Sequence, residues 1–137
     1  MAKLGEKPRR FLDESPYVGV VTTLREDGSP HSTIVWVDVE GDRVSFNTAR
    51  GRAKPKHLEH DPRASLLMVD PNNAFRWVAV SGPAELKEEG ADAQIDKLAK
   101  KYLGKDEYPW RNPEETRVKV LIEPEKVRHR LRRVEAP

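Results

Sequence analysis

The residues of this sequence best suited to chemistry are the cations of one short run, Arg50 to Lys56. Arginine or lysine stands at positions 50, 52, 54 and 56, and the run contains no acidic residue. It lies between a predicted strand and a predicted helix, and the unpaired N–H groups of a helix N-terminus attract anions. Gly51 lets the backbone approach a ligand closely. Arg52, Lys54 and Lys56 can add charge-assisted bonds to a phosphate. The alternatives are a solvated cationic surface and a nucleic-acid patch, although the aromatic residues are not interleaved with these cations.

Two tryptophans, Trp36 and Trp77, stand in the middle of predicted strands. Large aromatic residues in strands usually belong to the core. The alternative is that one of them lines a flat cleft against a planar ring. Trp36 favours the cleft, because its predicted strand face also carries Ser32 and Asp38 and is not a dry core face. The opposite face of the same strand carries Thr33, Val35, Val37 and Val39.

The sequence lacks the side-chain patterns of enzymes that catalyse reactions without an organic cofactor. The histidines at 31, 57, 60 and 129 show no zinc-ligand spacing with carboxylates, and there is no cysteine. No Ser-His-Asp pattern, nucleophile elbow, Gly-x-Gly-x-x-Gly or Walker motif occurs. We therefore expect no metal and name no catalytic side chain. If the protein is an enzyme, a bound cofactor supplies the reactive group.

Strand patterns outnumber helical patterns along the chain. Strands are predicted over residues 17–24, 31–39, 43–48, 64–69, 75–86, 118–122 and 126–131, with a bulge or edge in the fifth near Gly82-Pro83. Helices are predicted over 7–14, 51–60 and 92–103, with Gly104 just beyond the last. Consecutive hairpin-linked strands favour an antiparallel sheet, and this many strands usually close into a barrel. The predicted fold is mainly β, a barrel of about six or seven strands with two or three short helices.

Composition and charge exclude several classes of protein. The 137 residues predict one domain over 1–137, with an N-terminal helical segment at 1–15 and the barrel at 16–131. A net charge of +2 excludes a histone-like protein held to nucleic acid by overall charge. No apolar stretch is long enough to span a membrane or to serve as a signal peptide. We expect a cytoplasmic protein without a membrane or nucleic-acid partner.

A resemblance to the pyridoxamine 5′-phosphate oxidase-like split-barrel superfamily is carried by the runs DGSPHSTIVWVDVEGDRVSFNTARGRAKPKHLEHDPRASLLMV and RWVAVSGPAEL. The likeness extends over about residues 16–131 and is strongest to the flavin/deazaflavin oxidoreductases that use coenzyme F420. It implies an antiparallel split barrel that works as a homodimer, with the cofactor in a groove at the dimer interface. Related split barrels bind FMN or haem, and their motifs overlap with these.

The resemblance also implies which residues bind the cofactor. Residues 32–36 match the strand that runs along the cofactor ring, largely through backbone groups. Residues 47–48 match the next strand, which contacts the ring and the ribityl chain. The cations at 52, 54 and 56 match the phosphate-binding residues, and residues 76–77 match the place where the second subunit closes over the cofactor. The implied set is Ser32, Thr33, Ile34, Val35, Trp36, Asn47, Thr48, Arg52, Lys54, Lys56, Arg76 and Trp77.

The sequence departs from the family pattern at two points. His57 stands where this branch often has asparagine, and the sequence ends at Pro137 without the C-terminal substrate-binding segment of true pyridoxamine phosphate oxidases. Vitamin B6 synthesis is therefore not expected. The expected function is hydride transfer between reduced coenzyme F420 and a small conjugated or carbonyl-type acceptor. The alternatives are an FMN-dependent reductase on the same fold, a deazaflavin carrier without turnover, and a nucleic-acid module.

Overall fold

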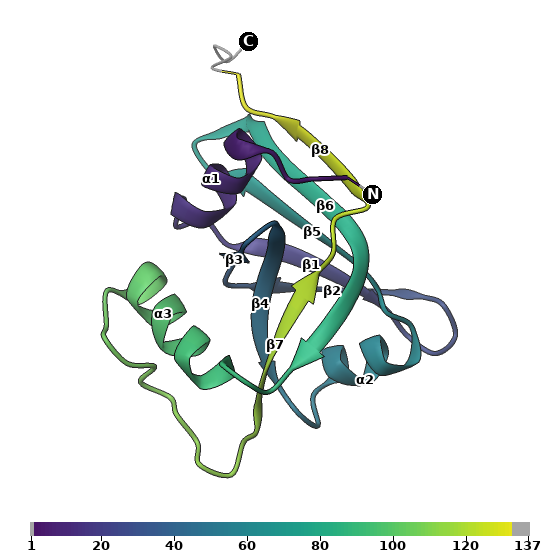
Figure 1. Cartoon of the computed structure of the whole chain (residues 1–137), viewed down its shortest axis with the longest axis vertical. Helices are drawn as coiled ribbons and strands as arrows, with labels where there is room; N and C mark the ends of the chain where they lie inside the picture. The colour runs from purple at the N-terminus through teal and green to yellow at the C-terminus, as the bar shows by residue number, and fades with distance from the viewer. Residues whose placement is uncertain (1, 133–137) are drawn as a thin grey trace.

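The computed structural model describes residues 2–132 of the chain (Figure 1). The rest of the domain predicted over 1–137 lies outside these residues. The helices are α1 (Glu6–Glu14), α2 (Ala53–His60) and α3 (Ala91–Leu103). The strands are β1 (Gly19–Leu24), β2 (Pro30–Val35), β3 (Asp38–Glu40), β4 (Arg43–Ala49), β5 (Arg63–Asp70), β6 (Asn73–Lys87), β7 (Arg117–Ile122) and β8 (Lys126–Arg130).

Every strand pair among the described residues is antiparallel. The strand order is β2-β1-β5-β6-β7-β4-β3, and β8 pairs with β6 off this path. The long strand β6 joins two parts: up to Pro83 it pairs with β5, in its middle with β8, and from Ala84 onward with β7. Figure 1 shows it curving across the molecule from β5 and β8 toward β7. The prediction of a mainly β, antiparallel fold with few helices is confirmed.

The interruption predicted near Gly82-Pro83 is wrong, because β6 continues through both residues. Gly82 lies where β6 changes partners. A Cβ at this position would overlap the backbone carbonyl oxygen of Glu123, so the close passage of the two backbones requires glycine. The register irregularity lies instead between Val69 and Asp70, where β5 meets the start of β6.

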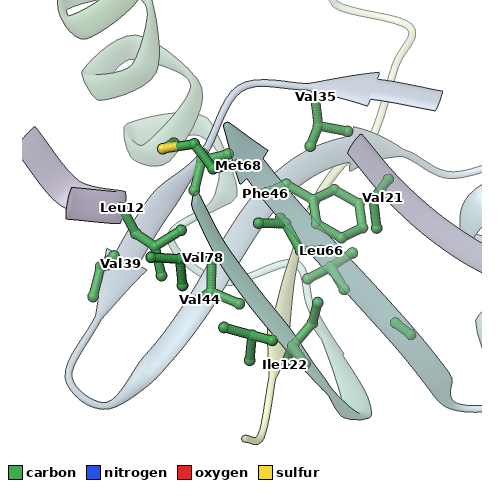
Figure 2. Close-up of a cluster of buried hydrophobic side chains, with 14 of the residues drawn as sticks. Leu12, Val21, Val35, Val39, Val44, Phe46, Leu66, Met68, Val78 and Ile122 are labelled. Carbon is green, nitrogen blue, oxygen red and sulfur yellow. The ribbon is translucent and has the colours of Figure 1, made fainter. Parts of the chain in front are cut away.

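The core lies between the strands and collects the inward side chains of each. In Figure 2, Phe46 lies in the middle of this cluster with Val21 and Leu66 beside it, and Leu12 comes from α1. Alternation along the strands explains the cluster, since successive side chains point to opposite faces of a sheet. Within the predicted strand 31–39, the inward side chains include three buried valines, Val35, Val37 and Val39.

The predicted strand 31–39 is two strands, β2 and β3, and this raises the number of strands in residues 2–132 to eight. Val37, at the break, is bonded to side chains of α3. Its N–H donates to the Oη of Tyr102 at 2.9 Å, and its carbonyl accepts from the Nζ of Lys101 at 2.7 Å. Lys101 also donates to the carbonyl of Leu12 at 2.8 Å, and Tyr102 to that of Tyr17 at 2.7 Å. Alternation of residue types continues through the break, so the sequence pattern does not reveal it.

Asp38 lies on the predicted face, which it shares with Trp36, but it is buried at 6% exposure. Its carboxylate accepts from the Nε2 of Gln94 at 3.2 Å and the Nζ of Lys97 at 2.8 Å, both on α3. Trp36 also stacks on α3, so packing of this helix against the polar face explains why Asp38 is buried.

The helices begin and end within two residues of their predicted bounds. Ser15 follows α1, and Gly104 follows α3 in the left-handed conformation at φ 71°, as expected for a C-terminal glycine. Figure 1 shows α1 and α2 at opposite ends of the barrel, whereas α3 lies outside it beside β3 and β4. Within residues 2–132, no helix combines the length and apolar character needed to cross a bilayer.

Lys101→Met should lower the free energy of unfolding by about 1–3 kcal/mol, because it leaves the carbonyls of Leu12 and Val37 without their donor. Urea denaturation followed by circular dichroism measures the loss. Lys100→Met is the matched control, since Lys100 forms an exposed ion pair with Asp106, and such pairs contribute at most about 1 kcal/mol. Equal losses in the two variants would contradict the role of Lys101.

The loss should also depend on pH, because burial lowers the pKa of Lys101 to about 8 from the ordinary 10.5. Between these values the unfolded chain binds more protons than the folded one. Wild type therefore gains stability with rising pH relative to the methionine variant. The same denaturation experiment should show the difference between the two proteins widening from pH 8 to pH 10. A difference that narrows over this range would contradict the lowered pKa.

Candidate functional site

A groove of about 260 Å³ lies beside the break between β2 and β3. Its walls come from β2, β4, the start of α2, α3, the loop over residues 104–116, and β7. In Figure 1 this loop extends below α3 and returns to β7. The lining residues are Ile34, Val35, Trp36, Asn47, Thr48, Arg52, Lys54, Ile95, Leu98, Tyr108, Trp110 and Arg117. The groove thus joins segments that are far apart in the sequence.

One part of the groove is aromatic. Trp36 stacks on Tyr102 of α3, with ring centroids 5.5 Å apart and planes at 7°. The ring of Tyr108 meets Trp36 edge-on at 6.2 Å, and Trp110 meets Tyr108 edge-on at 5.6 Å. Stacked and edge-on contacts of this kind hold aromatic rings in defined orientations. Trp110 keeps 63% of its surface exposed, so this part of the groove offers open aromatic surface to a planar ligand.

The other part of the groove is cationic. The Nζ of Lys54 donates to the Oγ1 of Thr33 at 3.1 Å. Burial of this side chain, and the nearby charge of Arg52, lower the pKa of Lys54 below its usual range. Arg117 donates to the Oδ1 of Asn47 at 3.3 Å and lies over the Tyr108 ring at 4.9 Å from its centroid. An anion in the groove would meet these cations where water is partly excluded, and there a charge-assisted bond is strong.

Thr48 carries a buried hydroxyl that is unpaired within residues 2–132. The residue lines the groove and is 1% exposed, and its Oγ1 atom has no hydrogen-bond partner in this part of the chain. A buried polar atom without a partner is rare and costs about 1–3 kcal/mol, so a ligand that bonds it gains affinity. Aromatic faces, an ammonium and a free hydroxyl fit a planar ring that carries a phosphate. The groove therefore fits a flavin-type cofactor.

Asp96 of α3 bonds the loop over residues 104–116 at two points. Asp96 accepts from the backbone N–H of Tyr108 at 2.9 Å and from Arg111 with both oxygens, at 2.6 and 2.7 Å. Both bonds from Arg111 come from its Nη2 atom, and bonds between charged groups of this kind are stronger than neutral ones. These bonds place Tyr108 and Trp110 along the groove. The aromatic wall of the groove, formed by Trp36, Tyr108 and Trp110, therefore depends on Asp96, which is outside the groove lining.

The structure brings together seven of the residues implied by the family resemblance and leaves five outside the groove lining. The seven are Ile34, Val35, Trp36, Asn47, Thr48, Arg52 and Lys54. Thr33 bonds Lys54 just outside the lining, and Ser32 bonds Thr22 at 2.8 Å on the exposed face. Lys56 is exposed on α2. The other two, Arg76 and Trp77, lie on β6.

Arg76 and Trp77 do not reach the groove of their own chain. Arg76 forms an ion pair with Asp70 at 2.8 Å and lies over the Phe11 ring, between β6 and α1. Trp77 pairs with Val69 and Arg130 in the sheet. Their predicted contact with the cofactor would therefore have to be made to the groove of a second chain.

Two of the four histidines, His31 and His57, form a pair close to Lys54. The rings of His31 and His57 meet edge-on at 5.0 Å, and the Nδ1 of His57 bonds the Oγ1 of Thr23 at 2.8 Å. Burial, followed by the charges of His31, Arg25 and Lys54, lowers the pKa of His57. Within residues 2–132, no cluster of three histidine, aspartate or glutamate side chains is placed to hold a metal ion.

Sequence reasoning missed the part of the groove that α3, the following loop and β7 provide, namely Ile95, Leu98, Tyr108, Trp110 and Arg117. The first two lie within the helix predicted over 92–103, but nothing in a helical pattern separates groove lining from core. Tyr108 and Trp110 lie between this helix and the strand predicted over 118–122, where no element is predicted. Two aromatic residues in a polar loop indicate that the loop packs on another part of the protein or on a ligand, because large aromatic side chains are usually at least partly buried.

Comparison with known proteins identifies the family. The pyridoxamine 5′-phosphate oxidase family matches residues 4–131. The chain belongs to this family. Membership indicates an oxidoreductase-type enzyme with a flavin-binding split barrel, and the eight strands and three helices described above are that barrel.

Solved structures with the same fold extend the comparison. A structure named F420 reductase matches at 24% identity with a TM-score of 0.76, covering 90% of this chain and 98% of the other. A conserved hypothetical protein of Mycobacterium tuberculosis matches at 25% identity with a TM-score of 0.73, covering 97% and 86%. An FMN binding protein of Nostoc punctiforme, related to pyridoxamine 5′-phosphate oxidase, matches at 15% identity with a TM-score of 0.60, covering 83% and 73%. At these identities the likeness concerns the fold.

Asp96→Ala should release the loop over residues 104–116, because it removes the acceptor for both Tyr108 and Arg111. Loss of a charge-assisted pair worth about 1.5–3 kcal/mol should make tryptic cleavage after Arg111 roughly tenfold faster or more. Limited proteolysis with mass spectrometry measures the rate. Asp92→Ala is the control, since Asp92 is exposed and lies 3.7 Å from Arg111. Unchanged cleavage in the Asp96 variant would show that these bonds do not hold the loop.

Proposed function

We propose that this protein is an oxidoreductase that transfers a hydride between the reduced deazaflavin coenzyme F420 and a small conjugated or carbonyl-type acceptor. The observation that carries the proposal is the groove, where an aromatic surface, the unpaired hydroxyl of Thr48 and the cations Arg52 and Lys54 meet. The fold shared with a protein named F420 reductase supports the choice of deazaflavin. The resemblance of residues 32–36 and 47–54 to the F420-using branch supports it further.

In this function the chain's own residues bind and orient. Lys54 and Arg52 hold the cofactor phosphate, and the Oγ1 of Thr48 bonds a polar edge of the bound molecule. Ile34 and Trp36 offer an apolar surface that keeps water from one side of the ring. The bound coenzyme supplies the hydride, and water supplies the proton that completes reduction of the acceptor. Because the acceptor needs only to be held in line with the ring, positioning accounts for the rate without a catalytic side chain of the protein.

The proposal includes a homodimer. An apolar row crosses the outer face of the sheet, where Ile34 pairs with Val20, Val20 with Leu67, and Leu67 with Ala79. Ile34 is 61% exposed and Leu67 39%, so the row is open in the single chain. The row starts at the groove, because Ile34 also lines it. A second copy docked on this row would bury apolar surface, cover the groove and bring its β6 residues 76–77 toward the cofactor.

An FMN-dependent reductase is the second candidate. The family match and the FMN binding protein of Nostoc punctiforme favour it, because FMN has a planar ring and a phosphate of the kind that the groove fits. A deazaflavin carrier without turnover would use the same contacts. The two cofactors differ in the charge of the phosphate group, and turnover separates an enzyme from a carrier.

Titration with oxidised coenzyme F420 tests the proposal, and it should quench tryptophan fluorescence saturably because Trp36 and Trp110 line the groove. Reduced F420 should then be reoxidised in the presence of members of a panel of quinones and enones. Saturation by FMN at much lower concentration than by F420 would favour the FMN reductase. Binding of F420 without turnover of any acceptor would favour the carrier.

Lys54→Ala should weaken F420 binding roughly tenfold to a hundredfold, because a charge-assisted bond to phosphate contributes about 1.5–3 kcal/mol. Isothermal titration at two salt concentrations measures it, and the loss should shrink as salt rises. Lys56→Ala is the matched control, since Lys56 lies two residues further along α2, exposed and outside the groove lining. Equal affinities of wild type and the Lys54 variant would mean that this lysine does not bind the phosphate.

Leu67→Glu should convert the dimer to a monomer, because it places a charge in the middle of the apolar row. Light scattering at micromolar concentration measures the mass. Leu103→Glu provides the control, since Leu103 at the end of α3 is equally exposed at 39% but lies outside the row. A wild-type protein that is monomeric with and without cofactor would refute the dimer.

A further inference from the structure

One carboxylate lies between two cations of the groove. The Oε1 of Glu115 accepts from the Nη2 of Arg52 at 2.8 Å, and its Oε2 lies 3.2 Å from the Nη2 of Arg117. The Arg117 side chain is 9% exposed, that of Glu115 27% and that of Arg52 50%. Glu115 belongs to the loop over residues 104–116 (Figure 1), whereas the arginines belong to the start of α2 and to β7. The carboxylate therefore joins the junction of the loop and β7, where Glu115 and Arg117 are two positions apart, to the start of α2.

The cations of the groove differ in the charge of their bonding partners. One arm of each arginine is already bonded to a carboxylate, and hydrogen bonding to Arg52 lowers the pKa of Glu115, which keeps it ionised. The Nζ of Lys54 is bonded to a neutral hydroxyl, that of Thr33. An anion that enters the groove therefore meets three cations, and the fixed negative charge of Glu115 lies against two of them, outside the groove lining. Attraction and repulsion both grow with the charge of the anion, but the repulsive part comes from Glu115 alone.

We propose that Glu115 is a specificity-determining residue that disfavours dianionic phosphomonoesters, such as FMN, relative to monoanionic phosphodiesters, such as the phosphate of coenzyme F420. The inference rests on the proposed function in placing the cofactor phosphate at Arg52 and Lys54. Its physical basis is that the repulsion energy is proportional to the charge of the ligand. Repulsion from one fixed charge is therefore twice as large for a dianion as for a monoanion at the same place. Removing the charge therefore tightens binding of a dianion by the square of the factor for a monoanion.

Glu115→Gln keeps the shape of the side chain and removes its charge. The variant should bind FMN roughly tenfold more tightly than wild type at pH 8, where the phosphate is a dianion. At pH 5, below the second phosphate pKa of about 6, the gain should fall to roughly threefold. Riboflavin, which has the same ring and no phosphate, should bind both proteins equally. Coenzyme F420 at pH 7.5 should gain only roughly threefold, so the preference shifts toward FMN.

The pH comparison depends on the ligand rather than on the protein. Arg52 and Arg117, the groups that face Glu115, keep their charge over this range. His57, whose pKa is lowered, is the same in both proteins, so its contribution cancels in the ratio of affinities. Fluorescence quenching by FMN, riboflavin and F420 provides the affinities without any turnover. The differences should also shrink in high salt, since the repulsion is screened.

Two further variants separate charge from structure. Glu115→Asp keeps the charge and should keep the wild-type preference, and Glu114→Gln removes an exposed charge one residue earlier and should change each affinity by less than about twofold. Thermal denaturation of each variant confirms that it is folded. If Glu115 only holds the arginines in place, Glu115→Gln should weaken FMN binding by the same factor at pH 5 and pH 8, and this result would overturn the inference.

The outcomes also separate this inference from the proposed function. Wild-type protein that binds neither FMN nor F420 would overturn both. Wild-type protein that prefers FMN would overturn the F420 assignment and the selectivity assigned to Glu115. Binding of both cofactors, with a Glu115→Gln gain that does not change between pH 5 and pH 8, would overturn the inference about Glu115 alone.

Discussion

Backbone groups buried at the break between β2 and β3 need partners, because an unpaired N–H or C=O in the interior costs about 1–3 kcal/mol. Lys101 and Tyr102 of α3 supply both partners of Val37, and this fixes the helix against the barrel. The ring of Tyr102 then provides the face on which Trp36 stacks. With α3 in place, Asp96 holds the following loop. The positions of Trp36, Tyr108 and Trp110 along the groove therefore depend on how the backbone groups at the break are hydrogen-bonded.

The cationic part of the groove is built from opposing charges at short range. Arg52 and Arg117 approach each other closely enough to share the carboxylate of Glu115, which offsets their repulsion. Lys54 has a hydroxyl partner instead, and burial lowers its pKa. A chain with a net charge of only +2 thus concentrates positive potential at one place. The loop that carries the aromatic wall also carries the balancing charge, so ring binding and anion binding are linked through one segment.

Local signals predicted most of the fold, and contacts between distant segments explain what they missed. The alternation of Val35, Val37 and Val39 correctly gave an inward face, but it continues across a break that only α3 explains. Gly82 predicts a bulge or an edge, whereas glycine is required there by the backbone carbonyl of Glu123, some forty positions away along the chain. The cations after β4 can be found from the sequence because they lie within seven consecutive residues. Arg117 and Trp110 joined them through tertiary packing, which leaves no periodic trace in the sequence.

The shared strand β6 has a consequence for how the molecule unfolds. Its first part belongs with β5 and β8, and its last part with β7, so both halves of the barrel are hydrogen-bonded to one continuous segment. Neither half can separate without exposing backbone groups of the other. Opening events that reach β6 should therefore be global, and its amide protons should exchange among the slowest in the chain. The loop over residues 104–116 belongs to no strand and is held by side-chain contacts with α3, Trp36 and Arg117, so it can open while the barrel remains one cooperative unit.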